Sequence, residues 1–237
     1  MERKSNNNLI FTILNGTALL GWSFILLLLL SSTFHVKSLW STHELERVLP
    51  SPLIILYILE GICLMEVGRI ALGHLKGNLL LGVVLHAIRI TWLVYVLSDR
   101  LQVLMKKSDD DFDKQQLSTI LQTELVLYSW SITEVCRYPM YLFPSSSMAR
   151  NLRLSVPIVS FPVGCTLEAY GAFCVVYADL FSSSADVIAT SWVKVGLLSM
   201  VILINGLLGP TLAYPAILKK GLPVLLGKQS VKARKME

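Results

Sequence analysis

The sequence predicts an all-α, polytopic membrane protein, a bundle of six transmembrane helices. Of its 237 residues, 54% are hydrophobic, and the mean hydropathy is +0.61. Apolar segments of the length that crosses a bilayer as a helix, about 20 residues, recur along the chain. This composition is too apolar for an ordinary soluble domain. Six spans with short connections use the whole length, so residues 1–237 are expected to form one membrane domain.

The first three expected spans follow a short polar segment, residues 1–8. Span one contains small residues and a tryptophan, which favour close helix approach and anchoring at the membrane interface. A polar loop separates it from span two. The link from span two to span three is short, so these spans are expected to form an antiparallel hairpin. The expected bounds are Leu9–Ser31, Pro52–Gly73 and Leu79–Ser98.

A hydrophilic connector, residues 99–116, leads to the last three spans. It carries three consecutive aspartates but lacks the spacing of a calcium-binding loop. Prolines are expected to bend the spans that follow, because proline removes a backbone donor. The segment from Pro144 to Arg153 is expected to be a loop. The expected spans are Leu117–Phe143, Leu154–Leu180 and Thr190–Leu218.

The distribution of lysine and arginine orients the chain. With six spans, one side receives 11 of these residues and the other receives six, so both termini are expected in the cytosol. The basic tail, residues 219–237, ends Arg234-Lys235-Met236-Glu237, which is similar to a dilysine-type retrieval signal of the endoplasmic reticulum. The net charge of +5 therefore reflects topology, and nucleic acid is not an expected partner.

Charged side chains inside the expected spans need partners, because an ionisable group there costs at least about 2.5–3.5 kcal/mol. Glu66 and Arg69 are three residues apart, as are Glu134 and Arg137, so each pair is expected to form on one helix. Arg89 has no acid on its own span and is expected to face an acid elsewhere, or a ligand. Spacings of four, three and four residues predict one polar stripe on span four: Trp130, Glu134, Arg137 and Tyr141.

Cysteine and histidine give no sign of a metal centre. The cysteines fall in apolar segments without metal-ligand spacing, and His86 is expected to be a hydrogen-bonded packing residue. We therefore predict no metal site and no disulfide framework. The cysteines expected as packed thiols are Cys63, Cys136, Cys165 and Cys174.

Glu168 differs from the other intramembrane charges because no basic residue lies within one helical turn of it. Phe161 lies seven residues earlier, about two turns, so both side chains are expected on one helix face. Asp179 is the next acid on roughly that face, near the membrane edge. A carboxyl group in these surroundings suits general acid or base chemistry. The residues alone predict an intramembrane acid–base site or a proton relay.

Three segments match a known pattern: LNGTALLGW (residues 14–22), WSITEVCRYPMY (130–141), and Arg153 followed by PVGCTLE (162–168). They resemble the 3-hydroxyacyl-CoA dehydratases of very-long-chain fatty-acid elongation, also called protein-tyrosine-phosphatase-like or PASTICCINO-like. The second segment is close to that family's Trp-Ser-x-x-Glu-x-x-Arg-Tyr-x-x-Tyr. The third corresponds to its Tyr-Pro-Val-Gly-x-x-x-Glu. Shorter matches lie at Glu66 and Arg89.

The resemblance implies six membrane helices in the endoplasmic reticulum, with both termini cytosolic. It implies a hydro-lyase that dehydrates a very-long-chain (3R)-3-hydroxyacyl-CoA to the trans-2-enoyl-CoA without a metal or redox cofactor. It also implies partners among the other elongation enzymes: the condensing enzyme, the ketoacyl reductase and the enoyl reductase.

The family's catalytic pair is a tyrosine and a glutamate. Carried over residue by residue, the glutamate is Glu168, and the tyrosine position holds Phe161, which can neither donate nor accept a proton. Leu14, Leu85 and Pro139 also depart from the family pattern. Supporting or substitute site residues implied by the matches are Glu134, Arg137, Tyr138, Tyr141 and Arg89.

Three interpretations follow from Phe161. Glu168 works with water at a reduced rate, or the chain is a non-catalytic relative that scaffolds elongation enzymes or holds acyl chains. Alternatively, another hydroxyl substitutes, from Tyr138, Tyr141, Ser160 or Tyr170. Basic residues on the expected cytosolic side are candidates to hold the phosphates of coenzyme A and equally candidates for topology determinants. These are Arg150 and Arg153, with Lys219 and Lys220.

Overall fold

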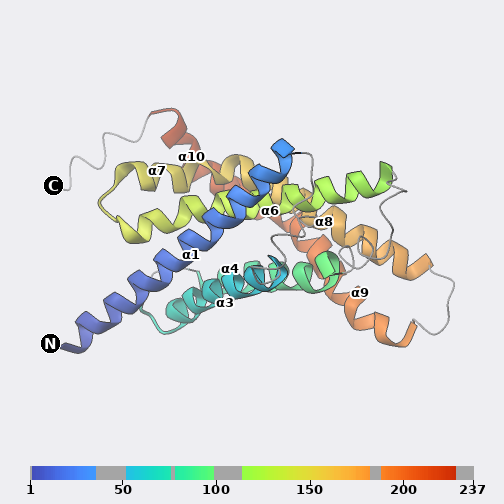
Figure 1. Cartoon of the computed structure of the whole chain (residues 1–237), viewed down its shortest axis with the longest axis horizontal. Helices are drawn as coiled ribbons and strands as arrows, with labels where there is room; N and C mark the ends of the chain where they lie inside the picture. The colour runs from blue at the N-terminus through green and yellow to red at the C-terminus, as the bar shows by residue number, and fades with distance from the viewer. Residues whose placement is uncertain (1, 36–51, 76–77, 99–113, 182–187, 228–237) are drawn as a thin grey trace.

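The computed structural model describes residues 2–35, 52–75, 78–98, 114–181 and 188–227. Every regular element in these segments is helical, which confirms the predicted all-α class. The elements, labelled as in Figure 1, are α1 (Glu2–His35), α3 (Pro52–Ala71), α4 (Leu79–Trp92), η1 (Leu93–Leu97), α6 (Lys114–Leu142), α7 (Ser147–Ser155), α8 (Pro157–Phe181), α9 (Ile188–Leu203), η3 (Ile204–Ala213) and α10 (Tyr214–Leu225).

Helix α6 lies at the centre of the bundle and packs against α1 and α8. Helix α8 packs in turn against α9, η3 and α10, while α3 and α4 pack against each other as the hairpin prediction requires. The segment from α9 through η3 to α10 is one continuous helical run (Figure 1). Its middle, η3, is π-helical and contains Pro210, which has no N–H to give the preceding turn.

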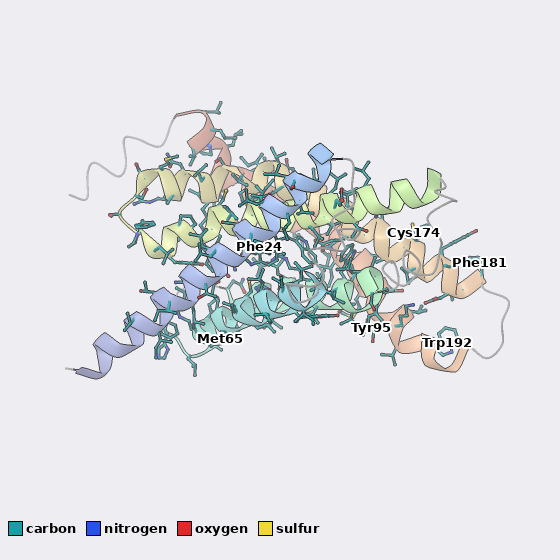
Figure 2. The ribbon with its side chains drawn as sticks, viewed as in Figure 1. Phe24, Met65, Tyr95, Cys174, Phe181 and Trp192 are labelled. Atoms are coloured by element: carbon teal, nitrogen blue, oxygen red, sulfur yellow. The ribbon has the colours of Figure 1, made fainter. Side chains whose placement is uncertain are left out.

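Large apolar side chains from several helices form the core. Trp22 of α1, Trp92 of α4 and Trp130 of α6 are each at most 2% exposed. The rings of Trp92 and Trp130 meet edge to face, with centroids 5.5 Å apart, an arrangement that aromatic pairs prefer. The opposite helix faces carry exposed apolar residues, as expected for helices that face lipid. Phe181 and Trp192, labelled in Figure 2, are 70% and 65% exposed.

Four helical segments are long and apolar enough to cross a membrane: Leu9–Ser31, Leu79–Leu97, Ser147–Phe181 and Trp192–Leu225. They correspond to the expected spans one, three, five and six. Expected spans two and four are the helices α3 and α6 but are not among these four. Both carry more charged residues than an apolar span usually contains, including Glu60, Glu66 and Arg69 in α3. The count of six is therefore not established by length and composition.

Several predicted boundaries were wrong. The expected loop before Arg153 is largely the helix α7, which Ser146 caps by accepting from the Ala149 N–H. The last helix extends to Leu225, so the predicted tail begins inside α10. Part of the hydrophilic connector, residues 99–113, and the tail with its retrieval-like ending, residues 228–237, lie outside the described residues.

Candidate functional site

Glu168 lies in the middle of α8 and is 6% exposed. Its Oε1 accepts a hydrogen bond from Trp130 Nε1 of α6 at 2.5 Å, and its Oε2 accepts one from Asn205 Nδ2 of η3 at 2.6 Å. Both oxygens are therefore held by N–H donors from two other helices. Neither donor is cationic, so the carboxyl group is fixed in direction without an ion pair. The sequence indicated Glu168 but not these two donors.

Phe161 and Glu168 both lie against η3, as their seven-residue spacing predicts. The Phe161 Cε1 lies 3.8 Å from the point where a Cβ on Gly209 would sit, and Glu168 bonds to Asn205 of the same segment. Cys165 Sγ lies 3.4 Å from that same point on Gly209. The family's tyrosine position therefore faces the same helix wall as Glu168, although Phe161 brings no hydroxyl to it.

The hydroxyl groups proposed to substitute for the missing tyrosine are bonded elsewhere. Tyr138 OH contacts Cys63 Sγ at 3.1 Å, and Tyr141 OH donates to Glu66 Oε1 at 2.5 Å. Ser160 Oγ contacts Thr133 Oγ1 at 2.8 Å and donates to the carbonyl of Val156. Tyr170 is 56% exposed on the outer face of α8. The structure thus directs the first three hydroxyls away from Glu168.

Ser129 is a hydroxyl residue that the sequence analysis missed. Its Oγ donates to the Ser160 carbonyl at 2.6 Å and lies 2.5 Å from the point where a Cβ on Gly164 would sit. Glu168 Oε1 lies 3.8 Å from that same point. A side chain at Gly164 would clash with the Ser129 hydroxyl, so this glycine lets α8 pack closely against α6 beside Glu168. Ser129 lies just before the matched segment, residues 130–141, so that pattern does not mark it.

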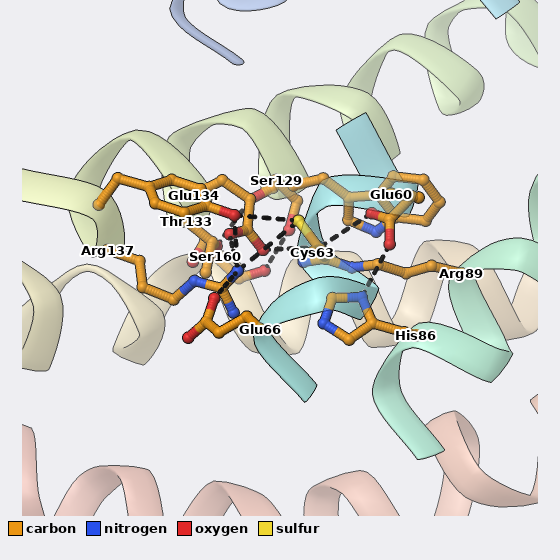
Figure 3. A network of polar contacts seen from close by, with 12 residues as sticks. Glu60, Cys63, Glu66, His86, Arg89, Ser129, Thr133, Glu134, Arg137 and Ser160 are labelled. Carbon is orange, nitrogen blue, oxygen red and sulfur yellow. Dashed lines mark hydrogen bonds and ion pairs between the residues drawn. The ribbon is translucent and has the colours of Figure 1, made fainter. Parts of the chain in front are cut away.

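A buried network of charges joins α3, α4 and α6 (Figure 3). Arg89 Nη1 contacts Glu134 Oε1 at 2.6 Å and Glu60 Oε1 at 3.2 Å, and all three side chains are at most 5% exposed. His86 Nδ1 lies 2.8 Å from Glu60 Oε2. The expectation that Arg89 faces an acid on another helix is confirmed, and it faces two. Since a lone buried charge costs several kcal/mol, these contacts account for charges inside the bundle.

The same network continues toward one end of α6. Arg137 Nη2 lies 2.7 Å from Glu134 Oε2 and 3.1 Å from Glu66 Oε2. The predicted Glu134–Arg137 pair is confirmed, whereas the predicted Glu66–Arg69 pair is wrong. Glu66 is held instead by Arg137 and by the Tyr141 hydroxyl, because these groups on α6 face it across the helix interface. The Arg69 guanidinium lies over the Phe11 ring, 3.7 Å from its centroid.

Trp130 connects this network to Glu168. The Arg89 guanidinium carbon lies 5.1 Å from the centroid of the Trp130 ring, within the range of cation–π contacts. The N–H of the same ring donates to Glu168. The polar stripe predicted for α6 is thus confirmed, and each of its four side chains has a partner on another helix. Arg89, which pairs with Glu134, thus packs against the same Trp130 ring that bonds to Glu168.

Three buried groups in this network have atoms that metals use as ligands. The ligand atoms of Glu60, Cys63 and His86 all lie within 4.8 Å of one another. Arg89 contacts the Glu60 carboxylate, and Arg137 Nη2 lies 3.7 Å from Cys63 Sγ. The one carboxylate of the three is thus already paired with a guanidinium group, and a second guanidinium group lies beside the thiol. The arrangement fits an ion-pair network better than a metal centre.

The basic residues considered for coenzyme A lie at the same end of α6 as Tyr141. Arg153 of α7 donates to Met140 Sδ at 3.2 Å, and its guanidinium carbon lies 5.1 Å from the Tyr141 ring centroid. Arg150 is exposed. A small cleft at this end, lined in part by Asn15, Glu66 and Arg69, leaves about 10 Å³ for the centre of a water molecule. That space holds about one water and no acyl chain.

The fold and the site together define a class of protein. It is a helical membrane protein with a buried, hydrogen-bonded carboxyl group between three helices. The profile of the family described as "Protein tyrosine phosphatase-like protein, PTPLA" matches residues 61–219, which include α4, α6, α8 and η3. The chain belongs to this family, which is that of the very-long-chain 3-hydroxyacyl-CoA dehydratases. Comparisons with curated proteins and with solved structures gave no significant match.

Proposed function

We propose that this chain is a hydro-lyase of fatty-acid elongation that converts a very-long-chain (3R)-3-hydroxyacyl-CoA to the trans-2-enoyl-CoA and water. The observation that carries the proposal is Glu168, a carboxyl group at mid-helix whose two oxygens are held by Trp130 and Asn205. Membership of the dehydratase family supports an acyl-CoA substrate and a membrane setting. A positioned carboxyl group is the minimum that this elimination requires.

Glu168 performs both proton transfers in the mechanism that we propose, because Phe161 has no proton to give. The Glu168 carboxylate removes a proton from C2 of the substrate, and the electron pair of that C–H bond forms the C2–C3 double bond. The C3–O bond breaks, and the departing hydroxide takes the proton back from Glu168 to leave as water. Glu168 ends as the carboxylate. This cycle requires the C2 proton and the C3 hydroxyl to lie on one face of the substrate.

We propose that α3 and α6 also cross the membrane, which makes six spans in one domain over residues 1–237. Helix α3 has 20 residues and α6 has 29, enough for about 30 Å and 43 Å of helix. The acids Glu60, Glu66 and Glu134 of these helices pair with arginines inside the bundle and so do not face lipid. We also propose that both termini are cytosolic, which the distribution of basic residues supports. The family and the dilysine-like ending support an endoplasmic-reticulum location.

In this orientation the cytosolic ends of α6 and α8 lie near Arg150 and Arg153, which we propose contact coenzyme A phosphates. Glu168 stands 11 residues inside the start of α8, so it is about 16 Å from the cytosolic end of that helix. The pantetheine arm has to cover this depth to bring the thioester to Glu168. The acyl chain then extends from Glu168 deeper into the membrane, away from the cytosolic end of α8.

Phe161 itself favours a second candidate function. A family member without the tyrosine hydroxyl can hold a 3-hydroxyacyl or enoyl chain without converting it. In that case the chain serves as a scaffold or acyl-binding partner of the condensing enzyme, the ketoacyl reductase and the enoyl reductase.

The test is turnover by the purified wild-type chain in detergent or nanodiscs, with a long-chain 3-hydroxyacyl-CoA as substrate. We expect a trans-2-enoyl-CoA product that mass spectrometry detects as the loss of one water. Protein inactivated by heat is the control. Co-purification with elongation enzymes, without product above that control, would contradict the lyase and support the scaffold.

A further inference from the structure

Asn205 is a buried polar residue with one described side-chain partner, the Glu168 carboxyl group. It is 6% exposed, and its Nδ2 lies 2.6 Å from Glu168 Oε2. The Asn205 NH₂ group is turned toward Glu168, which suits the ionised carboxylate because its oxygens only accept hydrogen bonds. Burial of an amide side chain destabilises the fold unless the amide is hydrogen-bonded. The contact with Glu168 therefore explains why this buried position can hold an asparagine.

The local structure of η3 brings Asn205 within reach of α8. Gly209 allows the close approach: a Cβ there would lie 3.4 Å from Cys165 Sγ and 3.3 Å from the Ile204 carbonyl. Gly206 lies against Ala169, the residue after Glu168, with 3.9 Å from its would-be Cβ to the Ala169 Cβ. Short π-helical segments inside α-helices occur often at functional sites. Here the π-helical segment η3 is the surface against which both Phe161 and Glu168 pack.

We propose that Asn205 is a positioning residue for the reaction, one that fixes the Glu168 carboxyl group through Oε2 while Trp130 fixes it through Oε1. This rests on the proposed function. The two donors come from different helices and bind different oxygens of Glu168. Together they fix both the position of the carboxyl group and the rotation of its plane. Without Asn205, Oε2 has no donor, and the group rotates about its remaining bond to Trp130. A carboxyl group that serves as both base and acid depends strongly on this rotation.

Asn205→Leu tests the proposal, because it keeps the branched shape and removes the donor. We expect kcat to fall about 10- to 100-fold, the value of a hydrogen bond to a charged group, with KM changed by less than about threefold. Asn205→Gln keeps an amide and should recover part of the loss. Thr211→Val is the matched control: Thr211 is exposed in the same η3 segment, and its Oγ1 donates to the Leu207 carbonyl of its own helix. It should leave kcat unchanged.

A second readout separates this inference from the proposed function. Hydrophobic carbodiimides modify carboxyl groups in membranes, and a carboxylate gripped by two N–H donors reacts slowly. We therefore expect Asn205→Leu to raise the labelling rate of Glu168, measured by peptide mass spectrometry, even if the wild-type chain shows no turnover. Equal labelling in Asn205→Leu, Thr211→Val and wild type would overturn the proposal, as would equal kcat values in an active enzyme. Wild-type inactivity with faster labelling in Asn205→Leu would reject the lyase alone.

Discussion

We expect Glu168→Gln to lower turnover of the proposed dehydratase by at least about 10²-fold, since a positioned acid or base typically contributes 10²- to 10⁴-fold. The substituted amide has the shape of the carboxyl group but neither takes nor gives a proton at neutral pH. It also turns an NH₂ group toward one of the two donors, Trp130 or Asn205, so one hydrogen bond is lost. Product formation by purified wild type and variant, at equal protein concentration, measures the effect.

Asp179→Asn is the matched control for this prediction. Asp179 is the other acid of α8, and it pairs with Lys194 at 3.2 Å at the far end of the helix, away from the three-helix site. Its replacement should leave turnover unchanged and show that loss of an acid from α8 is not itself harmful. Equal turnover in wild type and Glu168→Gln would remove Glu168 from the chemistry.

Arg89→Met is the substitution with the largest expected effect on stability. Arg89 is 4% exposed and contacts both Glu60 and Glu134, each of which is 1% exposed. Removal of the guanidinium leaves two acids in the bundle interior with one positive partner fewer, and the loss of one partner of a buried ion pair costs about 3–5 kcal/mol. Denaturant unfolding of the purified protein in mixed micelles measures the change in free energy.

Lys194→Met provides the comparison, because it also breaks an ion pair. The Lys194 and Asp179 side chains are 19% and 18% exposed, whereas Arg89 and its two partners are at most 5% exposed, so loss of the Lys194 pair should cost less. A loss in Arg89→Met no larger than in Lys194→Met would mean that the buried network is not what stabilises the contact between α3, α4 and α6.

Helical periodicity was sufficient to predict one side of the site. The stripe of α6 from Trp130 to Tyr141 and the shared face of Phe161 and Glu168 both follow from residue spacing within one helix. The all-α class follows from the apolar composition. The sequence also shows that Glu168 has no basic residue within one helical turn, and its two hydrogen-bond donors, Trp130 and Asn205, are neutral.

Contacts between helices could not be predicted in the same way. Glu66 and Arg69 have the spacing of an intrahelical pair, but the Glu66 carboxylate instead contacts Arg137 and Tyr141 on α6. Asn205 carries no sequence signal, since its role depends on how closely η3 approaches α8. The acids Glu60, Glu66 and Glu134 of α3 and α6 pair with arginines through such contacts, which hydropathy along one segment does not detect.

Turnover by Phe161→Tyr, measured beside the wild type, tests most directly whether this is a dehydratase site that lacks its second proton donor. The account predicts a rise of about 10²-fold or more, the usual contribution of a positioned acid, which Glu168→Gln in the same chain should abolish. Phe173→Tyr adds a hydroxyl to a ring of α8 that is 51% exposed and should change nothing. Turnover in Phe161→Tyr no higher than in wild type and Phe173→Tyr would contradict the account.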